Sequence, residues 1–198
     1  MGLSSLVRPD ARVASVCDMT PEWLAEREID AVLLDLDNTL APWRAHELPS
    51  HVREWLDKVR AAGVKVCLLS NSRTPRRVRQ VAETVGMPFV AWAGKPRRGG
   101  FGRALVVLGK TDARGVAMAG DQLLTDVVGA HRSGLYAVLV ERMTGAEFIG
   151  TRWVRVLERW LLRRYGPPAP TGRVCPHPGP PPEGEGRGTD QAEGEASS

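Results

Sequence analysis

The chain has 198 residues, a formal net charge of +4, and ordinary fractions of hydrophobic (42%) and charged (25%) residues. This length suits one folded domain with a real core, and the composition is typical of a globular protein rather than a disordered or fibrous one. No apolar run approaches the length of a membrane span, and we expect no signal peptide. Cys17, Cys67 and Cys175 are too widely spaced for a zinc site or a disulfide framework, so we expect a protein of the reducing cytoplasm.

Apolar strands and amphipathic helices alternate along the chain after a weakly patterned lead-in over residues 1–19. A helix is expected from Thr20 and Pro21, since these are typical N-cap and first-turn residues. The remaining expected helices cover 50–62, 74–86, the stretch after Pro96 up to 108, and 123–133. The expected strands cover 32–34, 64–69, 88–92, 115–119 and 135–140.

This alternation predicts the fold class. Strands joined by single helices favour right-handed crossovers and a mostly parallel sheet. We therefore expect an α/β protein, a Rossmann-like three-layer sandwich around a five-stranded sheet. From Gly166 the sequence becomes rich in Pro, Gly, Glu and Ser, which predicts a domain over 1–165 and a disordered tail over 166–198.

Polar residues follow the ends of four expected strands, and the carboxyl ends of parallel strands meet at one edge of a sheet. Carboxylates there favour a magnesium site, a lysine favours developing phosphoryl charge, and Ser and Asn donate to phosphate oxygens. Taken alone, two acids at a strand end are also typical of a solvated turn, Thr39 of a cap, and Asp126 of a charge at a helix start. The polar residues that follow these four strands are Asp35, Asp37, Ser70, Asn71, Lys95, Asp121 and Asp126.

Together these residues resemble the haloacid dehalogenase (HAD) phosphatase superfamily. The motifs are Asp35-Leu36-Asp37-Asn38-Thr39, then Ser70, then Lys95 in Gly-Lys-Pro, then the acidic pair of Gly120-Asp121-Gln122-Leu123-Leu124-Thr125-Asp126. The fuller pattern, including Asp-Leu-Asp-Asn-Thr-Leu-x-x-Trp, is similar to the YqeG family of subfamily IIIA over about residues 10–160. Relatives of that family include phosphatidylglycerophosphate phosphatases.

The resemblance implies an Mg²⁺-dependent phosphomonoester hydrolase that works through an aspartyl-phosphate. Asp35 would be the nucleophile and Asp37 the general acid and then base. Thr39, Ser70, Asn71 and Lys95 would bind the phosphoryl group. The metal ligands would be Asp35, the backbone carbonyl of Asp37 and Asp121, with Asp126 acting through a water or by orienting its neighbours.

The spacing of the motifs also bears on the substrate. The gaps from Thr39 to Ser70 and from Asn71 to Lys95 are too short for a cap domain, which predicts a capless HAD fold with an open site. The segment 151–165 places arginines and tryptophans on opposite helical faces. This pattern is typical of a helix on anionic lipid, or of a last helix packed on the core with a solvated basic face.

We therefore expect a phosphorylated substrate, with phosphatidylglycerophosphate at the inner face of a membrane as the leading candidate. The alternatives are a soluble phosphometabolite, a phosphoprotein, or a regulatory binding module on the same fold. The sequence shows no recognisable nucleic-acid-binding motif, so we expect no nucleic acid partner.

Overall fold

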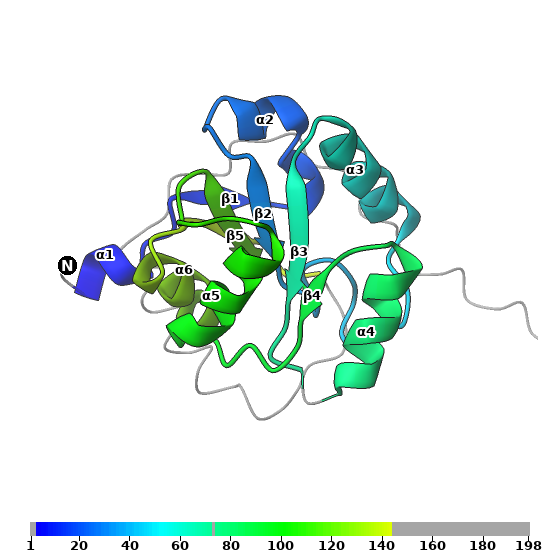
Figure 1. Cartoon of the computed structure of the whole chain (residues 1–198). Coiled ribbons are helices and arrows are strands. Elements are labelled where there is room, and N and C mark those ends of the chain that lie inside the picture. The colour runs from blue at the N-terminus through cyan, green and yellow to red at the C-terminus, as the bar shows by residue number, and fades with distance from the viewer. Residues whose placement is uncertain (1–2, 73, 144–198) are drawn as a thin grey trace, which may run out of the picture.

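Six parallel strands form one sheet in the computed structural model, which describes residues 3–72 and 74–143 (Figure 1). Their order across the sheet is β1-β6-β5-β2-β3-β4. The strands are β1 Ala11–Val13, β2 Ala31–Leu34, β3 Lys65–Leu69, β4 Phe89–Val90, β5 Val116–Gly120 and β6 Tyr136–Val140. The helices are α1 Leu3–Val7, η1 Val16–Asp18, α2 Pro21–Ala25, α3 Ser50–Ala61, α4 Pro75–Thr84, α5 Arg98–Val107, η2 Leu123–Val127 and α6 Val128–Arg132.

The predicted parallel α/β sandwich is confirmed, but the expected strand count of five is wrong. The additional strand, β1, pairs in parallel with β6, with Ala11 opposite Val138. It lies inside the lead-in that showed only a weak pattern. Three residues with an arginine at their centre are too short to display the period-two alternation that identifies a strand.

Side chains alternate along the central strands and build two separate cores. Val32 and Leu34 of β2 belong to the core that includes residues of α2, α3 and α4. Ala31 and Leu33 belong to the core on the other face, which includes residues of α1, α5, η2 and α6. Figure 1 shows these helices on both sides of the sheet, so strand ends at its centre are enclosed by both layers.

No cap domain interrupts the described part of the sheet edge where β2, β3 and β4 end. Between Thr39 and Ser70 the chain forms α3 and enters β3. Between Asn71 and Lys95 it forms only α4 and the two-residue strand β4 among the residues described. The predicted helix at 151–165 and the predicted tail from 166 lie outside the described residues. Among those that are described, no helix has the length and apolar character needed to cross a bilayer.

Candidate active site

Asp35 stands where β2 ends, between its neighbours β3 and β5. Its backbone N–H continues the ladder by donating to the carbonyl of Ala119 at 2.9 Å. The residue is only 6% exposed, so its carboxylate is held away from bulk water. A buried carboxylate requires a partner, and Asp35 has one in Lys95, whose Nζ lies 2.5 Å from Oδ1.

Lys95 links the first and last of the predicted motifs. Its Nζ is also 2.8 Å from Oδ1 of Asp126, and its side chain is 1% exposed. Carboxylate oxygens of Asp35, Asp121 and Asp126 all lie within 4.8 Å of one another. Motifs that are up to 91 residues apart in sequence, from Asp35 to Asp126, are thus brought into one charged cluster.

Burial and mutual repulsion set the proton affinities of this cluster. Burial raises the pKa of Asp35 to about 7; the Lys95 ammonium opposes this, while the carboxylates of Asp126 and Asp121 add to it. Burial acts to lower the pKa of Lys95, but Asp126 and Asp35 outweigh it and hold that pKa above its ordinary value. Lys95 therefore stays protonated at neutral pH. A further cation beside Asp35 would favour its ionised form and lower its pKa.

Asp121, after β5, offers an oxygen suited to a cation. Arg142 binds its Oδ2, with Nε at 2.7 Å and a second nitrogen at 2.6 Å. Within the described residues, Oδ1 of Asp121 is buried and has no hydrogen-bond partner. Burial raises the pKa of Asp121 to about 6, opposed by the Arg142 guanidinium and reinforced by Asp126. Three buried carboxylates, with Oδ1 of Asp121 left without a partner in the described part of the chain, fit a hard divalent cation, which prefers oxygen ligands.

Asp126 lies on η2, a π-helical turn that leads directly into α6, so the helix predicted over 123–133 is present but begins with a π turn. Its Oδ2 accepts from the backbone N–H of Gln122 at 3.1 Å. Gly120 leaves the space that this carboxylate occupies, because a Cβ there would lie 2.2 Å from Oδ2. Such π turns are often found at functional sites.

Asp37 is separated from this cluster. β2 ends at Leu34, so the strand does not continue through both aspartates, and their side chains go to different partners. Oδ2 of Asp37 is 2.5 Å from a guanidinium nitrogen of Arg77 on α4, and Oδ1 accepts from the backbone N–H of Arg44 at 3.1 Å. A tight turn follows, in which Asn38 adopts φ of +64°, a conformation that asparagine tolerates better than most residues.

The predicted phosphate-binding residues have different surroundings. Thr39 is fully buried and, among the described residues, its hydroxyl has no hydrogen-bond partner. Ser70 is buried at the end of β3, and its hydroxyl accepts from the Ser72 N–H at 3.0 Å. Asn71 instead holds the Lys95 backbone, donating to its carbonyl at 3.0 Å and accepting from its N–H at 2.8 Å. In this arrangement, the Asn71 amide fixes the position of Lys95.

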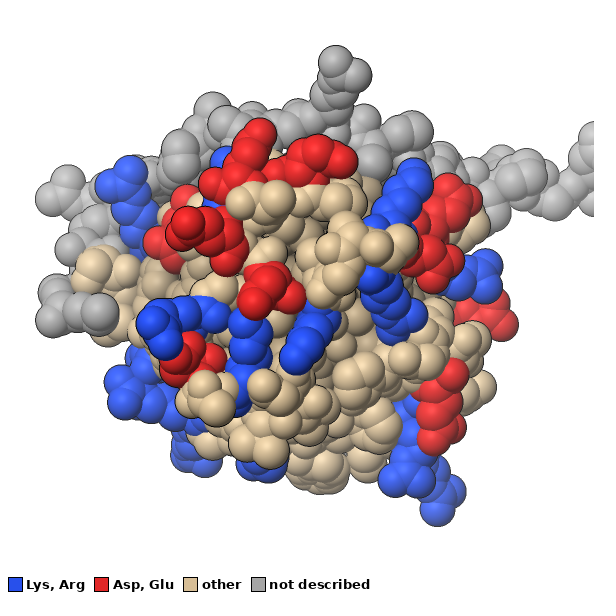
Figure 2. All heavy atoms as spheres, turned by 45° about the horizontal axis from the view of Figure 1, so that its top comes forward, with Lys and Arg blue, Asp and Glu red and all other residues tan. Residues whose placement is uncertain are grey.

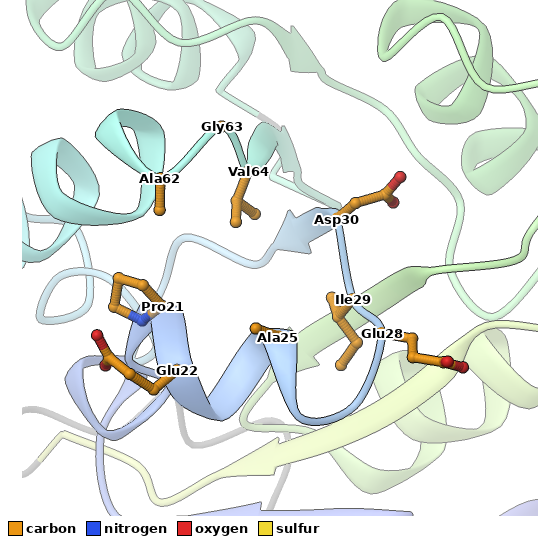
Figure 3. A pocket seen from close by; sticks show the side chains of 9 residues that line it. All are labelled: Pro21, Glu22, Ala25, Glu28, Ile29, Asp30, Ala62, Gly63 and Val64. Atoms are coloured by element: carbon orange, nitrogen blue, oxygen red, sulfur yellow. The ribbon is translucent and has the colours of Figure 1, made fainter.

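A pocket of about 530 Å³ lies at the opposite end of the sheet, between α2 and the end of α3. Figure 3 shows apolar side chains such as Ala25, Ile29 and Val64 around it, with acidic side chains at its edge. Its acid Asp30 is already paired with Lys110, at 2.5 and 2.6 Å. Acidic and basic side chains intermingle on the face that Figure 2 brings forward. The site at the strand ends is the stronger candidate, because its carboxylates lie within 4.8 Å of one another around a buried lysine.

Two family models match the chain, and each covers a different half of the site. The model described as mitochondrial PGP phosphatase matches residues 2–86, which carry Asp35, Asp37 and Ser70. A model described as HAD-hydrolase-like matches residues 92–147, which carry Lys95 and the two later acids. With the parallel sheet and the acidic cluster at its edge, these matches define a phosphatase of the HAD superfamily.

One curated relative narrows the identification. The probable phosphatase YqeG of Bacillus subtilis is 36% identical over 162 residues, which is 81% of this chain and 92% of the relative. The chain belongs to the YqeG family of HAD-type phosphatases.

Solved structures give weaker matches, with TM-scores below 0.5. A protein from Listeria monocytogenes serotype 4b is 19% identical, with a TM-score of 0.48, covering 67% of this chain and 99% of its own. A cobalt-bound deoxy-D-mannose-octulosonate 8-phosphate phosphatase from Haemophilus influenzae is 17% identical, with a TM-score of 0.45, covering 71% and 91%.

Sequence reasoning missed three residues of the site: Arg77, Arg142 and Gly120. Arg77 is one of three arginines within four positions of the chain, and nothing in the sequence separates it from Arg76 and Arg79. Arg142 follows β6, a strand end that carried no motif. Gly120 lies within the last sequence motif, but only the three-dimensional structure shows that the Asp126 carboxylate occupies the space where its side chain would be.

Proposed function

We propose that this phosphatase hydrolyses a phosphomonoester in an Mg²⁺-dependent reaction that passes through an aspartyl-phosphate on Asp35. The observation that carries the proposal is the buried Asp35 carboxylate, 2.5 Å from the Lys95 ammonium and inside a cluster of three carboxylates. Asp35, the Asp37 backbone carbonyl and Asp121 would hold the metal, with Asp126 beside them. When bound, Mg²⁺ would offset the negative charge of the carboxylates and of the phosphate.

The proposed chemistry has two steps. A carboxylate oxygen of Asp35 attacks phosphorus, the bond from phosphorus to the leaving oxygen breaks, and Asp37 gives that oxygen a proton. Asp37 then takes a proton from water as the water attacks the aspartyl-phosphate, which releases inorganic phosphate and restores Asp35. Lys95, Thr39 and Ser70 stabilise the charge on the transferred group, Lys95 as a compact cation and the two hydroxyls as donors.

The leading substrate is phosphatidylglycerophosphate, at the cytoplasmic face of a membrane. Its support is the family model matched by residues 2–86 and the chemistry of the exposed residues beside Lys95. These residues, Trp92, Arg97 and Arg98, are called the rim. Trp92, three residues before Lys95, is 62% exposed, and Arg97 and Arg98 are exposed just after it. No acidic residue occurs from 84 to 111. Exposed tryptophan with arginine suits an anionic lipid surface.

The test measures phosphate release from phosphatidylglycerophosphate in mixed micelles and from soluble p-nitrophenyl phosphate. We expect Mg²⁺-dependent turnover of both, abolished by a chelator and by Asp35→Asn. Trp92→Ala should lower turnover in micelles and leave the soluble substrate unaffected. Val106→Ala is the matched control, since Val106 is 76% exposed near the end of α5, away from the rim.

The other outcomes separate the alternatives. Cleavage of p-nitrophenyl phosphate without cleavage of the lipid would retain the phosphatase chemistry and move the substrate to soluble phosphometabolites or phosphoproteins. Cleavage of neither, with Mg²⁺ present, would refute the proposed reaction and favour a regulatory binding module. Activity that survives Asp35→Asn would refute the assigned nucleophile.

A further inference from the structure

Arg77 is a buried charge on α4 that no motif accounts for. It is only 7% exposed, although it stands in the first turn of a helix whose neighbouring arginines, Arg76 and Arg79, are exposed. Burying a guanidinium is strongly unfavourable unless an anion and further hydrogen bonds compensate. The groups that compensate the buried charge therefore indicate the role of Arg77.

Its principal partner is the second aspartate of the first motif. One guanidinium nitrogen of Arg77 lies 2.5 Å from Oδ2 of Asp37, and the other donates to the carbonyl of Ala45 at 2.9 Å. The backbone N–H of Arg44 binds the remaining oxygen, Oδ1, at 3.1 Å. Arg77 thus joins α4, the Asp37 carboxylate and the loop after it into one unit.

This anchorage matters because Asp37 receives none from the acidic cluster. The side chains of Asp35, Asp121 and Asp126 are fixed by Lys95 and Arg142, whereas that of Asp37 is directed toward α4. Arginine stays protonated and only donates hydrogen bonds, so it can orient the Asp37 carboxylate without exchanging a proton with it. Its planar fork also fixes direction, which a single ammonium does not.

We propose that Arg77 is a positioning residue for the general acid, holding the Asp37 carboxylate where it can protonate the leaving oxygen. The inference rests on the proposed function and deepens it. It requires a specific kinetic signature, because only a poor leaving group depends on the proton. An alkoxide leaving group requires protonation, while p-nitrophenolate departs without it.

The test compares kcat/KM for an alkyl phosphate, n-octyl phosphate, with kcat/KM for p-nitrophenyl phosphate. This parameter covers the reaction only through transfer to Asp35, so the later hydrolysis step does not enter it. For Arg77→Met we expect a loss of about 100-fold on the alkyl phosphate and of less than about fivefold on p-nitrophenyl phosphate. Asp37→Asn should show the same pattern more strongly, Arg77→Lys a weaker version, and Arg76→Met no change.

Equal losses on both substrates, or no loss on either, would overturn the inference, since a residue that only supports the fold affects both reactions alike. If Arg77→Met does not fold, the substrate ratio for Arg77→Lys decides in the same way. Failure of the proposed function looks different, because the unmodified protein would then hydrolyse neither substrate.

Discussion

Gly120 shows how a single missing side chain shapes the acidic cluster. The carboxylate of Asp126 fills the space where a Cβ would stand, and from there it contacts the Lys95 ammonium at 2.8 Å and the Gln122 N–H at 3.1 Å. Any larger residue at 120 must push that carboxylate out of both contacts. Glycine is required here by close approach of a side chain and not by backbone conformation.

We therefore expect Gly120→Ala to lower kcat/KM on p-nitrophenyl phosphate by about 10- to 100-fold, the usual effect of displacing a group that orients metal ligands. The half-saturating Mg²⁺ concentration should rise in the same titration. Gly102→Ala is the matched control, since no neighbouring atom lies within 4 Å of a Cβ built there on α5. A Gly120→Ala enzyme with normal activity and normal Mg²⁺ dependence would show that Asp126 need not occupy this position.

At the scale of elements, His131 ties α6 to the start of the chain. Its Nδ1 is 2.9 Å from the Leu6 carbonyl of α1, and its Nε2 is 3.1 Å from Oδ2 of Asp10, just before β1. Asp10 also accepts from the Ala137 N–H of β6 at 2.7 Å. The hydrogen bond with Asp10 raises the pKa of His131, and burial opposes it. Both ring nitrogens donate at once only in the protonated ring.

The sign of the pH dependence follows from the raised pKa of His131. Its contribution to stability is complete below the unfolded pKa of about 6.5 and is lost as the pH rises through the higher folded value. We expect His131→Gln to lower the free energy of unfolding by the order of 1 kcal/mol in mildly acidic solution, with the difference shrinking above neutral pH. Urea unfolding of both proteins across that range measures it. A difference that grows with pH would contradict this account.

The start of α5 shapes the edge of the site. α5 begins at the basic rim beside Lys95, with Arg103 donating from its second turn to the carbonyl of Trp92 at 2.9 Å. Trp92 itself has φ of +52°, a conformation that is unfavourable for a bulky residue. Through this contact, α5 helps to keep the exposed Trp92 indole at the edge of the site, in agreement with the proposed lipid substrate.

At the scale of the whole molecule, the sequence predicted the α/β class and every strand of the described sheet except β1. β2, β3, β5 and β6 are buried apolar runs, so their ends and the residues there could be located in advance. Asp35, Lys95 and Asp126 converge as predicted because parallel strands align their carboxyl ends.

The remaining features depend on contacts that sequence patterns do not encode. The end of β2 at Leu34 was expected, but the turn after it, which directs Asp35 and Asp37 to different partners, was not. Asn71 was expected at the phosphate, yet its amide is occupied by the Lys95 backbone. Arg77 looks like any exposed arginine of a helix until the fold buries it against Asp37.

The central claim is that Asp35 becomes phosphorylated, and trapping that intermediate tests it most directly. Asp37→Asn should accumulate it with p-nitrophenyl phosphate and Mg²⁺, because the leaving group needs no proton while hydrolysis of the aspartyl-phosphate lacks its base. Mass spectrometry after an acid quench should then find one phosphoryl group on the peptide containing Asp35, and none when Asp35→Asn is added. A phosphoryl group on another residue, or its persistence in the double variant, would contradict the account.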